Sequence, residues 1–298
     1  MTLVTHVLSV SLEPRHARAN SRLRSILEIV CEQDPTLGVE TGPAKEIVLK
    51  GISETHLEWV VEYLQREPDL PFSVGAPEVQ YRETVTRTID WVHTHKASDP
   101  AQYAKLRIQL APLPRGAGIE TEIHCPAEDI PEHIPLPEFQ RAIDAGIHAA
   151  CQTGVVGGFP LTDLQVVILN AGWHDTDSSP DAFEIAARLG LREALPRARP
   201  WLLEPVMVVV ALTPEDFLGD VVGDFNRRGG QVQGLAMHGT IAAVTATAPF
   251  ASLAGYEKDL KAMTHRRGAC AMAFDHYAEV PPRGDGEDPL PVVAAMRV

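Results

Sequence analysis

Hydrophobic positions near the start of the chain repeat first as in a strand and then as in a helix. The run His6–Glu13 alternates, and Leu23, Ile26, Leu27 and Val30 then fall on one helical face. Two short strands, a second helix with the same stripe and a last strand are expected at Val39–Thr41, Glu46–Ile52, Leu57–Leu64 and Phe72–Val79. The order βαββαβ predicts a ferredoxin-like domain.

The same order of elements recurs towards the end of the chain. A strand, a helix, two strands, a second helix and a final strand are expected at Leu203–Leu212, Pro214–Arg228, Gln231–Ala248, Phe250–Thr264 and Cys270–Phe274. The last residues are rich in Pro and Gly, which is typical of a loose tail. Two similar small domains therefore bracket a middle one.

The stretch between them mixes both patterns. Strand-like runs, a helix and a further strand are expected at Arg82–Val92, Lys105–Leu110, Ile119–His124, Phe139–Ile147 and Leu164–Leu169. The whole chain is therefore predicted to be α+β.

The stretch after the Leu164 strand combines a tight turn with a strong helix start. Ser179 is a good N-cap with Pro180 at the first helical position, and Ser178 with Asp181 offers an alternative capping-box register. In either register Trp173 and His174 fall at a tip. An aromatic ring and a histidine held there suit contact with an outside molecule, such as a stacked nucleobase.

Composition narrows the classes of function. With 298 residues and 45% hydrophobic content, the chain can bury two or three cores. No run reaches the length of a membrane span and the first residues lack a leader, so we expect a cytoplasmic protein without membrane contact. Cys31, Cys125, Cys151 and Cys270 lack CxxC spacing and are expected to be free thiols.

The formal net charge of −14 argues against a general nucleic-acid binder, so any RNA contact needs local patches of cations. The pairs Arg227-Arg228 and Arg266-Arg267 are the best candidates, although cations at helix ends also have an ordinary explanation in the helix dipole. No GxxxxGK[ST] loop, GxSxG elbow or HExxH motif occurs. We therefore expect no catalytic residue, no metal ligand and no cofactor in this chain.

Several segments resemble, in order, the later domains of bacterial elongation factor G. They are GISETHLEWVVEYLQRE, VQYRETV, GWHDTDSSPDAFEIAA, LLEPVMVVVALTPEDFLGDVVGDFNRRGGQVQG and GYEKDLKAM with AFDHY. The resemblance runs from about His6 to about Val280 and covers domains III, IV and V of that factor. The GTP-binding domain and the barrel that follows it in the family have no counterpart in this sequence.

The resemblance implies domain boundaries and a fold. It places a domain III-like part at 1–76, a domain IV-like part at 77–199, a domain V-like part at 200–282 and a flexible tail at 283–298. Two ferredoxin-like domains would flank an α+β domain like the second domain of ribosomal protein S5. The middle domain of the family is elongated, and its far end carries two adjacent loops.

The resemblance also implies contact residues at that far end. His174 matches the family histidine that reaches the decoding region of the small ribosomal subunit, with Trp173 in place of the usual tyrosine and Asp175 after it. The companion loop falls at His95–Tyr103 and contributes Lys96 and Gln102. That loop departs from the family, because Asp99 and Pro100 occur where glycines are usual.

Two further groups follow from the resemblance. In the family, domain V contacts the large subunit, which makes Arg227, Arg228, Arg266 and Arg267 phosphate contacts. Ser53, His56 and Glu58 match a motif of domain III that faces other domains, while helix capping by Ser53 is the ordinary alternative.

The resemblance favours a ribosome-binding translation module that acts in translocation. Its partners would be ribosomal RNA and the tRNA and mRNA of the A site, it would act as a monomer, and GTP would belong to the missing domain. The alternative is a GTPase-less paralogue that acts as a ribosome-binding regulator, an antibiotic-resistance decoy or a ribosome-protection factor. The position of Met1 close to the first strand, the divergent loop and the acidic tail favour a complete protein.

Overall fold

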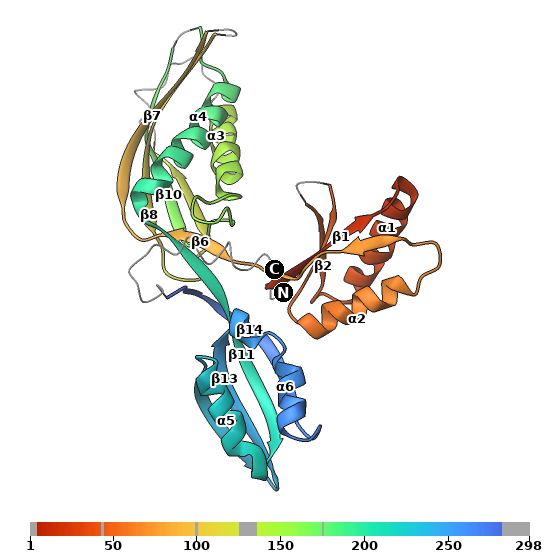
Figure 1. The fold of residues 1–298 in the computed structure, drawn as a ribbon. Helices are drawn as coiled ribbons and strands as arrows, with labels where there is room; N and C mark the ends of the chain where they lie inside the picture. Colours follow the sequence, from red (N-terminus) through yellow and green to blue (C-terminus); the bar gives the residue numbers. More distant parts are fainter. Residues whose placement is uncertain (1–4, 43–44, 99–100, 125–135, 175, 282–298) are drawn as a thin grey trace. The chain divides into compact units, whose positions relative to one another are not determined.

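The protein is described by a computed structural model for residues 5–42, 45–98, 101–124, 136–174 and 176–281. Figure 1 shows the ribbon of the chain, which divides into two compact units by its internal contacts. One holds the chain up to Gln80 together with Glu204–Ala278, and the other holds Tyr81–Leu203. The predicted division into three domains stays a prediction, and the predicted tail at 283–298 lies outside the described residues.

The first ferredoxin-like fold is built from residues before Gln80. Its elements are β1 (Leu8–Pro14), α1 (Ala17–Gln33), β2 (Gly38–Thr41), β3 (Ile47–Gly51), α2 (Glu54–Gln65), β4 (Phe72–Val74) and β5 (Glu78–Val79). The strands are antiparallel in the order β2-β3-β1-β4, and β5 also pairs with β1. The strand expected over Phe72–Val79 is two short strands, because Pro77 has no N–H for the ladder.

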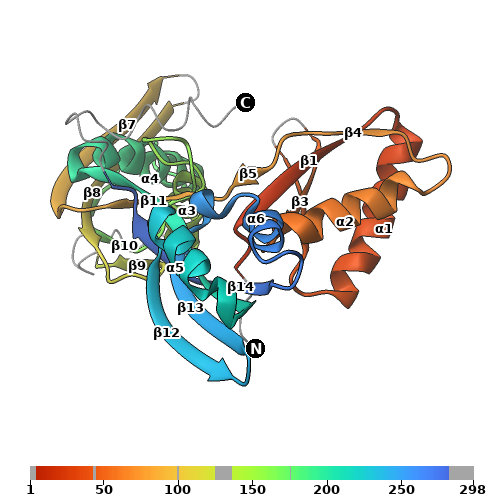
Figure 2. The same cartoon turned by 60° about the horizontal axis from the view of Figure 1, so that its bottom comes forward.

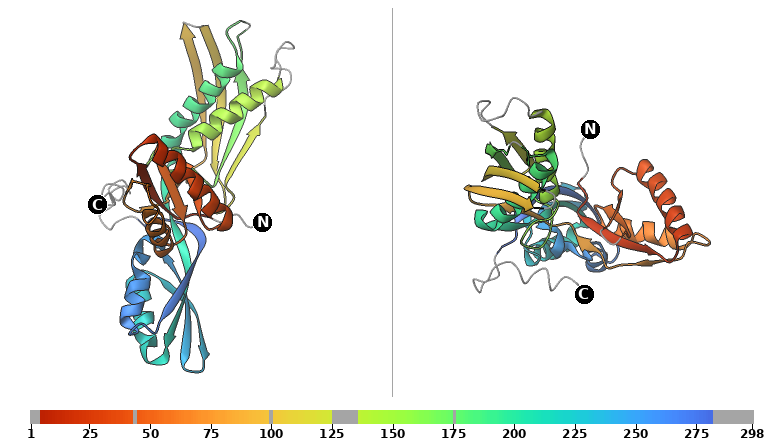
Figure 3. Two further views of the ribbon diagram at one scale, coloured as in Figure 1. Left: turned by 90° about the vertical axis from the view of Figure 1, so that its right-hand side faces the viewer. Right: turned by 90° about the horizontal axis from the view of Figure 1, so that it is seen from above.

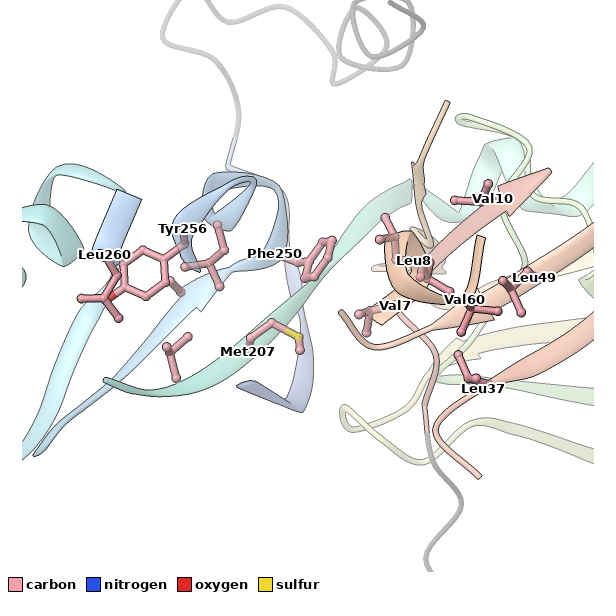
Figure 4. Packing of buried hydrophobic residues seen from close by; sticks show 14 of the residues in the cluster. Val7, Leu8, Val10, Leu37, Leu49, Val60, Met207, Phe250, Tyr256 and Leu260 are labelled. Carbon is pink, nitrogen blue, oxygen red and sulfur yellow. The ribbon is translucent and has the colours of Figure 1, made fainter. Parts of the chain in front are cut away.

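Both helices of this fold pack on its sheet (Figure 2). The buried side of α1 contains Leu23 and Leu27, and the buried side of α2 contains Leu57, Val60 and Leu64. These are the apolar stripes that the spacing predicts, and they meet side chains such as Leu49 from the sheet (Figure 4).

The second ferredoxin-like fold has the same topology. Its elements are β11 (Pro200–Pro214), α5 (Leu218–Arg227), β12 (Gln231–His238), β13 (Ile241–Pro249), α6 (Tyr256–Met263) and β14 (Ala269–Glu279), in the sheet order β12-β13-β11-β14. Each expected helix begins later than predicted, after a 3-10 turn at Glu215–Phe217 or Phe250–Leu253. Gly255, with φ of 68°, separates the second turn from α6. Tyr256, Met207 and Phe250 line the core (Figure 4).

The middle fold contains β6 (Arg82–Val85), β7 (Ile89–Ser98), β8 (Ala101–Pro112), β9 (Ile119–Ile123), α3 (Leu136–Cys151), β10 (Leu164–Gly172) and α4 (Pro180–Ala194). The sheet order is β7-β8-β10-β9, with β9 and β10 parallel and the other pairs antiparallel. Figure 3 shows α3 and α4 side by side over this sheet. A Cβ at Gly146 would lie 2.3 Å from the Glu184 carbonyl oxygen, so the close approach of the two helices requires glycine there.

The α+β class is confirmed, and both outer domains have ferredoxin-like strand orders. The three described cysteines, Cys31, Cys151 and Cys270, are free thiols. Among the described residues no helix is long and apolar enough to span a membrane.

Candidate functional site

The segment His95–Tyr103, which was expected to be a loop beside His174, belongs to a long hairpin of β7 and β8. The strands pair from His95 with Ala104 to Ser98 with Ala101. The expectation of a loop over His95–Tyr103 was therefore wrong, because the ladder continues almost to the end of the hairpin (Figure 1). Asp99 and Pro100 lie outside the described residues.

Hydrogen bonds join this hairpin to the segment that follows β10. The backbone N–H of Tyr103 donates to the Asp177 carbonyl oxygen at 2.8 Å. The Ser178 hydroxyl donates to the Tyr103 carbonyl oxygen at 2.8 Å and accepts from the His174 N–H at 2.9 Å. The end of the β7–β8 hairpin and the segment after β10 are about 70 residues apart in the sequence but form one site. We call this site the tip.

His174 is an exposed residue of the tip. Its side chain is 52% exposed, and its Nδ1 lies 3.2 Å from Asp177 Oδ2 and 3.3 Å from Thr176 Oγ1. The imidazole also lies beside the Tyr103 ring, with 5.9 Å between ring centroids. The inner nitrogen is thus engaged by neighbouring groups, while Nε2 has no hydrogen bond to any described residue and is able to meet an outside partner.

Lys96 and Gln102 lie on the hairpin side of the tip. The Lys96 ammonium is exposed and lies 5.4 Å from the centroid of the Tyr103 ring, within cation–π range. The Gln102 side-chain oxygen lies 3.0 Å from His95 Nε2, which orients the amide. The tip therefore presents a cation, a phenol ring and an imidazole close together.

Trp173 does not occupy the exposed position expected for a stacking platform. Its ring is half-buried and packs against Phe139 and Phe183, with centroid separations of 4.8 and 4.4 Å. The indole N–H is enclosed and has no hydrogen-bond partner among the described residues. The side chain points back towards α3 and α4, so it supports the packing of the two helices. Asp175 lies outside the described residues.

The start of α4 follows the first of the two predicted registers. Ser179 is the N-cap, and its hydroxyl accepts from the Ala182 N–H at 3.2 Å. Ser178 does not form the alternative capping box, because its hydroxyl is committed to the tip. Two adjacent serines thus have separate structural tasks.

The pair Arg227-Arg228 is tied to neighbouring carboxylates. The guanidinium of Arg228 is 16% exposed and donates to Asp224 at 2.8 Å, to the Ser252 carbonyl at 2.8 Å and to Asp259 at 2.6 Å. The prediction that Arg228 contacts phosphate therefore conflicts with its position. Arg227 is exposed but also pairs with Asp224, which is 4% exposed.

These contacts control the ionisation of Asp224. Burial by itself raises the pKa of this carboxyl, but hydrogen bonds from Arg228 and Arg227 outweigh burial and hold its pKa below the ordinary value. Asp224 in turn holds the Arg228 guanidinium, which joins α5 to Asp259 of α6 and to the Ser252 carbonyl of the 3-10 turn at Phe250–Leu253.

Arg266 and Arg267 project from the turn after α6. Both are exposed, and the turn is closed by the Thr264 hydroxyl, which accepts from the Gly268 N–H at 2.7 Å. Arg267 lies over the Phe217 ring at 4.9 Å. Arg266, with φ of 64°, is exposed and forms no ion pair with a described residue.

The three residues predicted as a group at the start of α2, Ser53, His56 and Glu58, do not share a common partner. Ser53 occupies the N-cap position without a side-chain hydrogen bond, so the capping alternative is wrong for its hydroxyl. His56 Nε2 lies 3.3 Å from Asp34, and Glu58 lies 3.2 Å from the Lys258 ammonium. A role for these residues towards other domains stays a prediction.

Two residues of the tip were not recognisable from the sequence, since Tyr103 was expected only as the end of a loop and Asp177 was not expected to contact His174. Tyr103 proves central, because its backbone closes the tip and its ring lies between Lys96 and His174. The only signal in the sequence is an aromatic residue near the end of the β7–β8 ladder, which by itself is typical of any strand.

Three family models match consecutive parts of the chain: Elongation Factor G domain III at residues 4–76, Elongation factor G domain IV at 77–199 and Elongation factor G C-terminus at 201–285. The curated relative Elongation factor G 2 of Hahella chejuensis is 38% identical over 278 residues, which are 92% of this chain and 40% of the relative. A crystal structure from Thermus thermophilus matches with a TM-score of 0.72 and 32% identity, over 95% of this chain and 42% of that one. The chain thus spans about two fifths of the length of these relatives.

Proposed function

Because the chain belongs to the elongation factor G family and carries its domains III, IV and V, we propose that it binds the ribosome and applies its tip to RNA. The RNA in question is that of the decoding region with the A-site tRNA and mRNA, and the process served is translocation. Nucleotide hydrolysis is assigned to the family's GTP-binding domain, not to this chain.

The construction of the tip carries this proposal. Tyr103, Asp177 and Ser178 hold the exposed His174 in a defined place beside Tyr103 and Lys96. A lysine neutralises phosphate, an imidazole exchanges hydrogen bonds with base edges or 2′-hydroxyls, and an aromatic ring edge packs on ribose or base. This local set of groups suits RNA even though the whole chain carries a formal charge of −14.

A second contact is proposed at the turn after α6. Arg266 and Arg267 are exposed on it, and they would contact RNA of the large subunit. Arg227 is a weaker candidate because it shares Asp224 with Arg228, whose guanidinium is already engaged.

Co-sedimentation with purified bacterial ribosomes tests the proposal. Binding should weaken with salt on a shallow log–log slope, as for about two to four phosphate contacts at about 0.7 to 0.9 per contact. His174→Ala should weaken binding about fivefold, which is the worth of one good hydrogen bond. His124→Ala is the matched control, because His124 is a 61% exposed histidine of the same fold. Equal affinity of both variants, or no binding at low salt, contradicts the proposal.

A second candidate function is ribosome occupancy without translocation. The sequence Asp99-Pro100, where the family usually has glycines, favours it, because an aspartate repels phosphates and a proline limits close approach of the backbone. Added to a system that translocates with a complete elongation factor G, the chain should then inhibit in proportion to its occupancy. Asp99→Gly should change inhibition more than Asp90→Gly, since Asp90 of β7 is already paired with Arg107 of β8. Support of translocation when a separate GTP-binding half is supplied would exclude this second candidate.

A further inference from the structure

Helix α2 displays a row of aromatic side chains to solvent. Trp59 is 61% exposed and Tyr63 is 44% exposed. Their rings are nearly parallel, with an interplanar angle of 17° and 6.2 Å between centroids. The His56 ring lies 6.4 Å from Trp59 on the preceding turn. Spacings of three and four residues place the three rings along one side of the helix.

The packing of α2 does not account for this row. The helix is held to its sheet by Leu57, Val60 and Leu64, each at most 1% exposed, which form a different side of the helix. Two large rings that stack on each other in solvent expose apolar area that the fold does not use. The row also lies outside the tip, so the proposed RNA contacts do not explain it.

The charges beside the rings indicate what they bind. Helix α2 contains no lysine or arginine, and of its three glutamates Glu58 pairs with Lys258 at 3.2 Å and Glu54 accepts from the Gly255 N–H at 3.2 Å, which leaves Glu62 beside the rings. Glu62 is the surface neighbour of Trp59 three positions on, and its side chain is 65% exposed. Asp34 adds a further carboxylate 3.3 Å from His56. The cation beside Glu62 is Arg66, 81% exposed and 3.6 Å away, which makes a weak surface pair.

A cation over an aromatic face is attracted by the ring and here also by the adjacent carboxylate. A guanidinium fits better than an ammonium, because its plane stacks on indole or phenol while its N–H groups reach a carboxylate. We propose that Trp59, Tyr63 and Glu62 form a docking surface for an arginine-bearing segment of a partner protein. Nucleic acid is disfavoured because its phosphates would meet the glutamates, and a second copy of this chain would bring the same carboxylates together.

Fluorescence anisotropy with a labelled synthetic peptide, RGRGRGRGR, tests the docking surface. Trp59→Ala should weaken binding about three- to tenfold and Tyr63→Ala about two- to fivefold, as loss of exposed cation–π contacts implies. Trp59→Phe should restore most of the affinity because it keeps a ring face. The same peptide with citrulline in place of arginine should bind at least about tenfold more weakly, because citrulline carries no charge.

Matched charge variants separate this surface from general attraction to an acidic chain. Glu62→Gln should weaken binding about two- to threefold, while Glu120→Gln, which changes an exposed glutamate of β9, should leave it unchanged. Equal effects of the two, or full binding by Trp59→Ala, would overturn the proposal. Stronger binding of labelled oligouridylate than of the peptide, abolished by Trp59→Ala, would overturn it in favour of RNA. His174→Ala should not affect peptide binding, so the outcome is independent of the ribosome experiments.

Discussion

The hydroxyl of Ser178 donates to the carbonyl oxygen of Tyr103 at 2.8 Å, across 75 residues of sequence. The same hydroxyl accepts from the N–H of His174 at 2.9 Å. One side chain thus connects the β7–β8 hairpin to the backbone that positions the exposed imidazole. These hydrogen bonds hold the backbone of the tip together, while the side chains of His174 and Lys96 remain exposed to solvent.

Substitutions of the adjacent Ser178 and Ser179 should have different effects, one on ribosome affinity and the other on the free energy of unfolding. Ser178→Ala removes the link to Tyr103, so ribosome affinity should fall about as much as in His174→Ala. Ser179→Ala removes the N-cap of α4 and should cost about 1 kcal/mol in the free energy of unfolding with little change in affinity. Urea denaturation and ribosome co-sedimentation measure the two effects. If Ser179→Ala lowers the affinity as much as Ser178→Ala, the assignment of separate tasks is wrong.

Substitutions of Trp173 and His174, which follow β10, should differ in their effect on the free energy of unfolding. Trp173→Ala empties a site between Phe139 and Phe183 and should lower the free energy of unfolding by about 3 kcal/mol. His174→Ala changes an exposed side chain and should shift it by less than about 0.5 kcal/mol. Chemical denaturation followed by circular dichroism distinguishes them. A large loss of stability in His174→Ala would show that the imidazole is structural.

Substitutions of Arg228 and Arg266 should also differ, the first in its effect on stability and the second in its effect on ribosome binding. Arg228→Ala leaves the Asp224 carboxylate buried with only the exposed Arg227 beside it, which should destabilise the fold by about 3 kcal/mol. Arg266→Ala should change stability by less than about 0.5 kcal/mol but weaken ribosome binding and reduce the salt slope by about one contact. Loss of ribosome binding by Arg228→Ala in a protein of unchanged stability would restore it as a phosphate contact.

Acid should weaken the last fold through Asp224. A carboxyl whose pKa is lowered in the folded state stabilises that state above its unfolded pKa of about 4, and the contribution is lost as pH falls through the lower folded pKa. Stability should therefore decline below about pH 4. Asp224→Asn should be less stable at neutral pH and show a shallower decline in acid than Asp220→Asn, which changes an aspartate on the same helix. Parallel pH profiles of the two variants would contradict this account.

Local pattern was sufficient for most of the fold. The apolar stripes of α1 and α2 and the continuous strand within β11 appear in the sequence as spacing, because helix and strand periods place such residues on one face whatever lies opposite. The Ser179-Pro180 start of α4 was equally visible, since capping depends on groups within one turn. The extent of the hairpin at the tip was not, because pairing between Lys96 and Tyr103 is a property of two strands and not of either alone.

Which of the singled-out side chains face outward depends on tertiary contacts. The motif at residues 170–183 contains Trp173 and His174 side by side, yet one ring packs on Phe139 and the other is exposed, because that choice depends on helices folded over the sheet. The sequence places Asp224 near Arg228, but Ser252 and Asp259 reach the same guanidinium only when α5 and α6 pack together. The amino-acid order by itself therefore determined the elements, their order and the family, since these depend on short-range periodicity and local motifs. The tertiary structure alone decided which cations and rings remain available, because burial and pairing depend on residues distant in the chain.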